Sequence, residues 1–214
     1  MVFAKIYLLC KIFFRKFMSG AEFERRDRRD RSNGDELIPR VSEETIVIFM
    51  MEFLPEVAAA VEGNVDHFPA TCLERIRAVN PIIVEYIEEL AGRSPELLYS
   101  NYVTMAGVLV YRLLEHEFER RGEKMPIVKR QILDSLKMDI GQEEGYFQNL
   151  ANSLVTENYE LRRALALYLV PLGWLPNGEL PLNQAVSSVL ESGLGVYALI
   201  KAQLEEYSKH RRTD

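Results

Sequence analysis

The sequence contains few of the residues on which metal sites and disulfide frameworks depend. Its 214 residues include two cysteines, three histidines and one tryptophan. Cys10 and Cys72 lie far apart and belong to no CxxC or Cys/His spacing, which argues against a disulfide framework and against a structural zinc site. This use of cysteine favours a reducing cytoplasm. We therefore expect neither a metal nor a cofactor.

Motifs of common enzyme classes are also missing. His67, His116 and His210 have no partner at metal-ligand spacing, and the segment Glu115–Glu119 contains neither HExxH nor ExxH. The sequence has no Walker A loop, no GxGxxG after a strand and no GxSxG elbow. These absences favour a non-enzymatic protein.

No stretch approaches the roughly 18 uninterrupted apolar residues of a membrane-spanning helix. The longest candidates, residues 103–114 and 196–200, are much shorter. The body of the chain is therefore predicted to be soluble.

The charge is divided unevenly along the chain. Residues 1–40 hold ten of the 26 basic residues but only six of the 32 acidic ones, a net charge of +4, whereas residues 41–214 carry a net charge of −10. Phosphate neutralisation needs clustered Lys and Arg, so an acidic body argues against general nucleic-acid binding.

Residues 2–17 contain no acid and have the pattern of a basic amphipathic helix. Its basic residues fall within one arc of about 140° and are Lys5, Lys11, Arg15 and Lys16. The opposite side carries Phe3, Ile6, Cys10, Phe13 and Phe17. Such a helix predicts peripheral contact with a membrane or docking into an apolar groove. In the alternative interpretation Met18 is the true start, and residues 1–17 are a non-native upstream extension.

Residues 18–40 read as a mixed-charge linker. Within them, residues 21–36 combine five Arg with six acids and contain almost no apolar residue. Such a segment cannot bury enough apolar surface to offset its ordering entropy, so we expect a flexible tether.

Residues 41–214 show helical spacing of apolar residues and no sustained period-2 alternation, which predicts an acidic all-α domain, a helical bundle of about eight helices. Start signals stand near Ser42, Thr71, Asn80, Ser94, Pro126, Glu143, Glu157 and Pro181. Asn80 and Pro81 form a cap and first-turn pair, and Gly122 is expected to end the long helix that precedes it.

The sequence also suggests an internal duplication. Residues 38–41 match residues 125–128 at an offset of 87, and residues 107–114 match residues 193–200 at an offset of 86. Between them Ile76, Asn80 and Ile83 pair with Leu154, Asn158 and Leu161 at an offset of 78. This predicts two tandem four-helix repeats, about 38–122 and 125–210, packed with pseudo-twofold symmetry. Chance resemblance between amphipathic helices is the alternative.

Three functions remain open on these patterns. The favoured one is a non-enzymatic helical interaction or assembly module, whose partner is another protein or a second copy, with Trp174 and Leu175 in an interhelical loop as contact candidates. The second is an apolar small-molecule pocket lined by Met105, Tyr111 and Tyr197. The third is an enzyme or metal-binding protein whose Glu carboxylates converge between the repeats, for which the candidates are Glu85, Glu88, Glu89, Glu115 and Glu119.

Overall fold

A computed structural model describes residues 37–46, 49, 68–93, 97–169 and 184–211 of the chain. The predicted leader, the linker up to residue 36, and the loop with Trp174 and Leu175 lie outside these residues. The residues from Ile38 onward form one contact unit.

All regular structure in the described ranges is α-helical, which confirms the predicted all-α class. A helical turn at residues 43–46 comes first. The helices that follow are α4 (Phe68–Arg77), α5 (Pro81–Gly92), α6 (Leu97–Arg120), α7 (Arg130–Gln142), α8 (Tyr146–Glu157), α9 (Tyr159–Leu169) and α10 (Gln184–Arg211).

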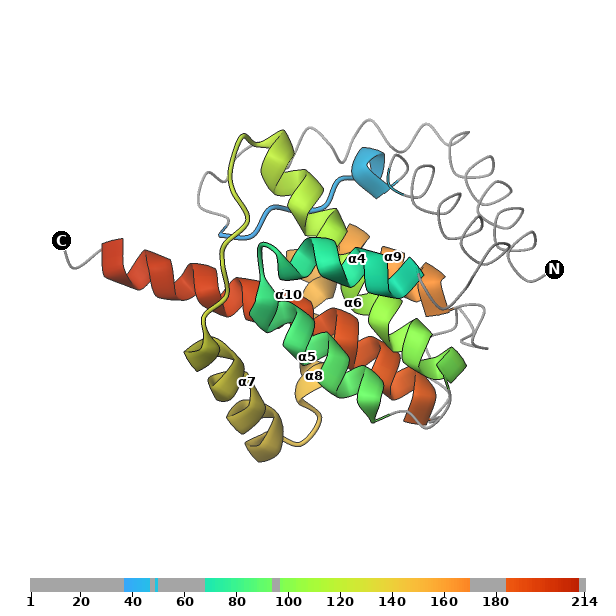
Figure 1. The fold of residues 1–214 in the computed structure, drawn as a ribbon. Coiled ribbons are helices and arrows are strands. Elements are labelled where there is room, and N and C mark those ends of the chain that lie inside the picture. Colours follow the sequence, from blue (N-terminus) through green and yellow to red (C-terminus); the bar gives the residue numbers. More distant parts are fainter. Residues whose placement is uncertain (1–36, 47–48, 50–67, 94–96, 170–183, 212–214) are drawn as a thin grey trace. The chain divides into compact units, whose positions relative to one another are not determined.

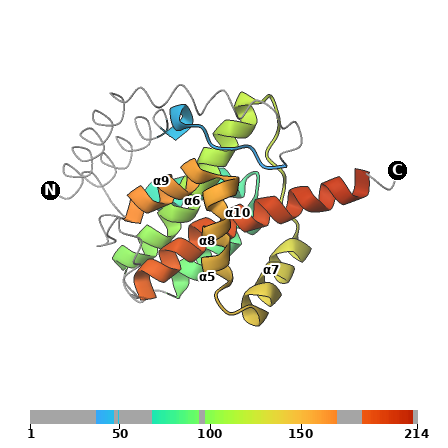
Figure 2. The ribbon, with the colours of Figure 1, turned by 180° about the vertical axis from the view of Figure 1, so that it is seen from behind.

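The two longest helices, α6 and α10, form the centre of the bundle and make the most extensive helix-to-helix contact of the described elements. Figure 1 shows α4 and α5 on one side of this pair. The reverse view in Figure 2 has α8 and α9 on the other side, with α7 next to α10. The core of the bundle therefore lies along α6 and α10, between two pairs of shorter helices.

Glycines allow the neighbours of α6 and α10 to come close. A Cβ atom on Gly107 of α6 would lie 2.7 Å from the side chain of Ile87 and 2.8 Å from Ser192 Oγ on α10. On α10, a Cβ atom on Gly193 would lie 2.6 Å from the side chain of Leu165 and 3.2 Å from Val110 on α6. Gly107 and Gly193 therefore each stand at a crowded contact with both the facing long helix and a shorter one.

Two of the predicted helix boundaries are confirmed. Ser42 caps the turn at residues 43–46, because its Oγ accepts a hydrogen bond from the Thr45 N–H at 3.0 Å. Gly122, with φ 71°, ends α6, and the N–H of Glu123 reaches back to the carbonyl of Phe118 at 2.9 Å, as in a Schellman motif.

One other prediction at a helix start is wrong. The helix expected from Pro126 begins only at Arg130, and residues 125–128 form a non-helical connecting segment. Asn80 and Pro81 are the N-cap and first-turn residues of α5, as predicted, but the Asn80 side chain makes no capping hydrogen bond. Its carboxamide is instead bonded to that same connecting segment.

Candidate functional site

The most specific polar contacts inside the bundle are made by two buried asparagines that each hold a short non-helical segment. Asn80, between α4 and α5, donates from Nδ2 to the carbonyl of Pro126 at 2.9 Å and accepts at Oδ1 from the N–H of Val128 at 2.8 Å. Tyr111 Oη lies 3.5 Å from the same Nδ2. One carboxamide therefore binds both a carbonyl and an N–H of residues 125–128.

Asn158, between α8 and α9, makes the same pair of bonds to a different segment. Its Nδ2 donates to the carbonyl of Pro39 at 3.1 Å, and its Oδ1 accepts from the N–H of Val41 at 3.0 Å. The two asparagines also share an uncommon backbone conformation, with φ and ψ of −135° and 68° at Asn80 and −152° and 67° at Asn158. The two sites are thus alike in backbone and in side-chain bonding.

We call residues 38–41 and 125–128 the first and second strap, and each asparagine with its strap a clasp. In both straps the first bonded residue is a buried proline and the last is a valine with 2% of its surface exposed. The residue between them, Arg40 or Ile127, is exposed. In each clasp the asparagine therefore binds the backbone of a Pro-x-Val segment, and the proline and valine side chains of that segment are buried.

A second buried side chain binds the residue that follows each strap. Glu117 Oε1 on α6 accepts from the Ser42 N–H at 2.8 Å, and Gln203 Oε1 on α10 accepts from the Lys129 N–H at 2.9 Å. Glu117 and Gln203 are both fully buried. Each strap is therefore bonded to one shorter-helix junction and to one of the two central helices.

Glu117 is held ionised by its neighbours. Burial opposes ionisation, but hydrogen bonds from the Thr45 hydroxyl, the Ser42 N–H and the Arg120 guanidinium outweigh it and lower the pKa of Glu117. At the corresponding place on α10, neutral Gln203 donates from Nε2 to Glu206 at 2.9 Å. The acceptor on α6 is therefore negative and the acceptor on α10 is neutral with an acid beside it.

Ion pairs of opposite polarity lie next to the two clasps. Arg130, which follows the second strap, makes a bidentate contact with Glu85 on α5. Glu43, which follows the first strap, lies 3.4 Å from Arg163 on α9. The strap-side residue is thus basic at the first asparagine and acidic at the second.

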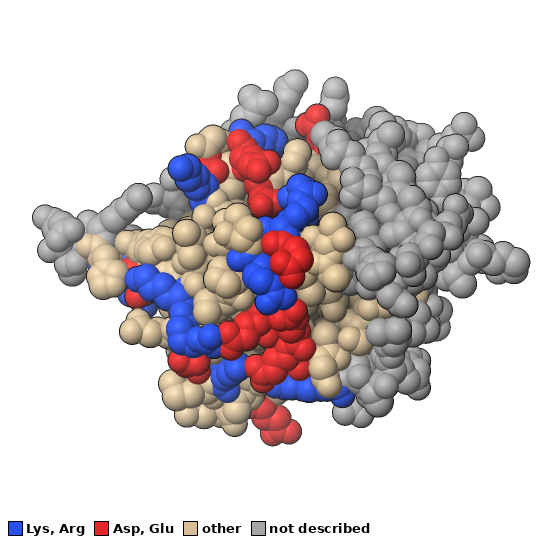
Figure 3. Space-filling model, viewed as in Figure 1, with Lys and Arg blue, Asp and Glu red and all other residues tan. Residues whose placement is uncertain are grey.

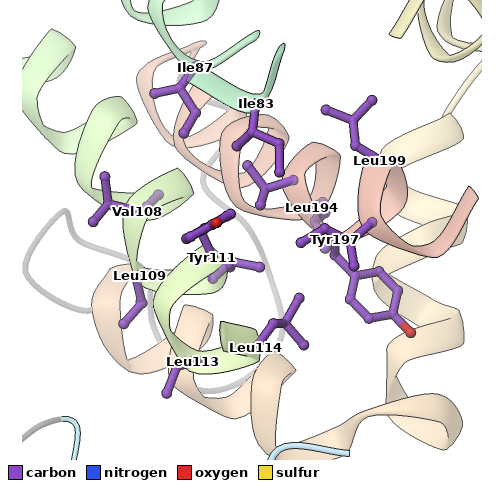
Figure 4. Close-up of a cluster of buried hydrophobic side chains, with 14 of the residues drawn as sticks. Ile83, Ile87, Val108, Leu109, Tyr111, Leu113, Leu114, Leu194, Tyr197 and Leu199 are labelled. Atoms are coloured by element: carbon purple, nitrogen blue, oxygen red, sulfur yellow. The ribbon is translucent and has the colours of Figure 1, made fainter. Parts of the chain in front are cut away.

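The aromatic residues proposed to line a ligand pocket lie within the core. Met105, Tyr111 and Tyr197 are buried, and Figure 4 shows the two tyrosines among apolar side chains of α5, α6 and α10. Tyr197 donates from its hydroxyl to Glu157 Oε2 at 3.1 Å. Burial raises the pKa of Tyr111. Both hydroxyls therefore have a polar neighbour within the protein.

The carboxylates of α5 are paired with basic side chains on the surface. Figure 3 shows acidic and basic residues intermixed over the face formed by α4, α5 and α7. A hydrogen bond from Arg130 lowers the pKa of Glu85, and hydrogen bonds from Lys137 and Arg93 lower that of Glu89. Glu88 pairs with Arg77. These contacts account for the candidates on α5 as members of an ion-pair network.

On α6, Glu115 pairs with Arg112, while Glu119 is exposed.

One carboxylate has its pKa shifted in the direction expected of a catalytic acid. Burial and the neighbouring charge of Glu43 raise the pKa of Glu160, against the effect of Arg163. Arg163 lies within 3.4 Å of Glu43 and 3.2 Å of Glu160, so its charge compensates this pair.

The sequence comparison aligned Asn80 with Asn158 as equivalent positions, but it did not indicate which groups these side chains bind. The available signal was the coincidence of two patterns, an Asn at a helix junction and a Pro-x-Val segment, each present twice. An asparagine before a helix is ordinarily read as a cap, so a bond to a distant segment is not apparent from local sequence.

Comparison with family models, with curated proteins and with solved structures gives no match. Within the described ranges, no helix is long and apolar enough to cross a membrane. The same residues contain no group of three or more His, Cys, Asp or Glu arranged to hold a metal ion.

Proposed function

We propose that this protein is a non-enzymatic interaction and assembly module that binds extended Pro-x-Val segments through its asparagine clasps. The observation that carries the proposal is the chemistry of the clasp. A buried carboxamide bound to both a carbonyl and an N–H of one segment, with a further acceptor for the next N–H, is a peptide-binding arrangement.

We further propose that the module consists of two tandem copies of one four-helix unit, residues 38–122 and 125–210. The support is that contacts recur at the offsets of the sequence match. Pro39 and Pro126 are 87 residues apart, Asn80 and Asn158 are 78 apart, and Glu117 and Gln203 are 86 apart. Matching hydrogen bonds between residues so distant in the chain favour duplication over chance similarity between amphipathic helices.

In this arrangement each copy holds the strap of the other. The first strap, at the start of the N-terminal copy, is bonded to Asn158 in the C-terminal copy. The second strap, at the start of the C-terminal copy, is bonded to Asn80 in the N-terminal copy. Within one chain, the clasps therefore already join the two four-helix units to each other. We propose that the protein uses the same contacts to recognise such segments in a partner.

Peptide binding by a clasp with a weakened strap tests the proposal. In the full-length protein, Val41→Asp places a charge where Val41 is buried and should release the first strap from Asn158. A labelled peptide of residues 36–46 should then bind, as measured by fluorescence anisotropy. Circular dichroism verifies that the variant folds, and Val41→Ala is a milder replacement if it does not.

Two controls make the outcome specific. The same peptide with Asp at the Val41 position should not bind, and the peptide should not bind a double variant that also carries Asn158→Ala. If the folded variant fails to bind the wild-type peptide at millimolar concentration, the clasps do not recognise free segments and the proposal is wrong.

A further inference from the structure

The two clasps differ in how the chain enters and leaves them. The second strap follows α6 after four residues and leads into α7 through Lys129 alone, so packed helices hold it on both sides. The first strap lies at the edge of its contact unit, which begins at Ile38. On its other side, 18 residues, 50–67, separate Phe49 from α4.

The segment from Ile38 to Phe49 is anchored to the rest of the bundle as one protein is anchored to another. Ile38, Val41, Ile46 and Phe49 are all buried in the core. Its polar contacts run to residues more than seventy positions away, Glu117, Asn158 and Arg163. Apolar anchors surrounded by specific hydrogen bonds are the ordinary composition of a protein interface.

From these contacts we propose that the first strap exchanges between two copies of the chain, so that residues 38–46 of each copy occupy the Asn158 clasp of the other. A second copy supplies a segment that is identical to the one already bound, so the occupied site reproduces every contact of the monomer. Exchange of an identical element is a low-cost route to a dimer. This inference rests on the proposed function, because it uses the same clasp in trans.

Charge directs the exchanged strap to the Asn158 clasp. At Asn158, Glu43 of the incoming strap meets Arg163, as it does within one chain. At Asn80 the corresponding place is next to Glu85, which would repel Glu43. Like charges brought together suppress the wrong pairing, so the swapped dimer has a defined arrangement.

The covalent connection favours the strap of the same chain at low protein concentration. A tethered segment has an effective concentration in the millimolar range. The dimer should therefore be a minor species at micromolar concentration and increase at several hundred micromolar, or after the strap has been released by mild denaturant and the protein returned to buffer.

Complementation between two full-length variants tests the exchange. Asn158→Ala has an intact strap and a defective clasp, and Val41→Ala has a defective strap and an intact clasp. A swapped dimer of either variant alone has two defective pairs, whereas a swapped dimer of the two has one intact pair and one pair that carries both changes. The mixed dimer should form with a dissociation constant about tenfold lower than that of either variant alone, measured by native mass spectrometry of chains with different tags.

A cross-linking measurement covers the case in which the point variants are too unstable. One chain carries Arg40→Cys and the other Tyr159→Cys, both at exposed positions next to the Asn158 clasp, in a background with Cys10→Ser and Cys72→Ser. A short bismaleimide should join the two chains after mixing. The matched control replaces Tyr159→Cys by Met138→Cys on exposed α7, which should give no mixed product.

If the mass spectrum of the mixture only superposes the spectra of the two variants and shows no additional mixed dimer, and if no cross-link joins the chains, the exchange is overturned. That result is distinct from failure of the proposed function, which is judged by peptide binding to the Val41→Asp protein. Peptide binding without mixed dimers would mean that the clasp binds segments but that the strap of a second copy does not reach it.

Discussion

Replacing Asn158 by alanine should destabilise the protein far more than an ordinary asparagine substitution. The change removes two hydrogen bonds and leaves the Val41 N–H and the Pro39 carbonyl without their partner. Val41 has only 2% of its surface exposed, so solvent replaces the lost partner poorly. Each unpaired buried group costs about 1 to 3 kcal/mol, so the two groups together give a loss of about 2 to 6 kcal/mol.

A loss of this size is a substantial part of the roughly 5 to 15 kcal/mol by which most domains are stable. Urea unfolding, followed by circular dichroism and extrapolated to zero denaturant, measures it directly. Asn80→Ala should produce a loss in the same range, because it removes the bonds to Pro126 and Val128. Hydrogen exchange adds a local measurement, since the Val41 amide should lose its protection in Asn158→Ala.

Asn152→Ala is the matched control. Asn152 is an exposed residue of α8 whose side chain contacts only Gln148 in the described hydrogen bonds, so its replacement should change stability by less than about 0.5 kcal/mol. If Asn158→Ala and Asn80→Ala both fall within that margin of the control, the clasps contribute nothing to holding the straps. The reasoning that identifies them as binding sites would then be refuted.

Three further changes have defined outcomes. The folded pKa of Glu117 is below the value of about 4.5 for a free carboxyl, so its contribution to stability is present above that pH and lost as the pH falls through the folded pKa. Glu117→Gln should therefore reduce the loss of stability as the pH falls below about 4.5, measured by urea unfolding at each pH. Gly195→Ala should lower the free energy of unfolding by about 1 to 3 kcal/mol, because the added Cβ would lie 1.9 Å from Tyr86 Oη. In a double-mutant cycle, Tyr86→Ala should reduce this cost of the added methyl group. The basic pattern of residues 2–17 predicts that the full chain sediments with anionic vesicles at low salt and that residues 18–214 do not; equal sedimentation of both would contradict it.

Much of the helical framework could be predicted from the sequence because it depends on local patterns. The stripe through Val103, Val110 and Leu114 indicated a long central helix, and these residues are fully buried in α6. Gly122 stops that helix as expected, since it supplies the positive φ that a Schellman ending requires. Periodicity and end signals are properties of neighbouring residues, so they can be read without a structure.

The straps could not be predicted in the same way. Pro126 resembles the first residue of a helix, but residues 125–128 are not helical and are bonded to Asn80, which lies 46 residues before Pro126. Asn158 likewise resembles a helix cap until the bond to Val41, across 117 residues, is known. Side-chain bonds to a distant backbone leave no periodic signal. The repeated offsets were the available indication, and they suggested equivalence between residues without suggesting contact.

The charges around the clasps explain how two such similar sites can receive different straps. In the observed pairing, Arg130 meets Glu85 and Glu43 meets Arg163. If the straps were interchanged, Arg130 would face Arg163 and Glu43 would face Glu85, and both contacts would become repulsive. An unpaired like-charge contact in a partly buried place opposes the wrong arrangement more strongly than an exposed ion pair favours the correct one. The opposite polarity of the two ion pairs is therefore as important as their presence. If both sites carried the same charges, the ion pairs would not distinguish one strap from the other at either asparagine.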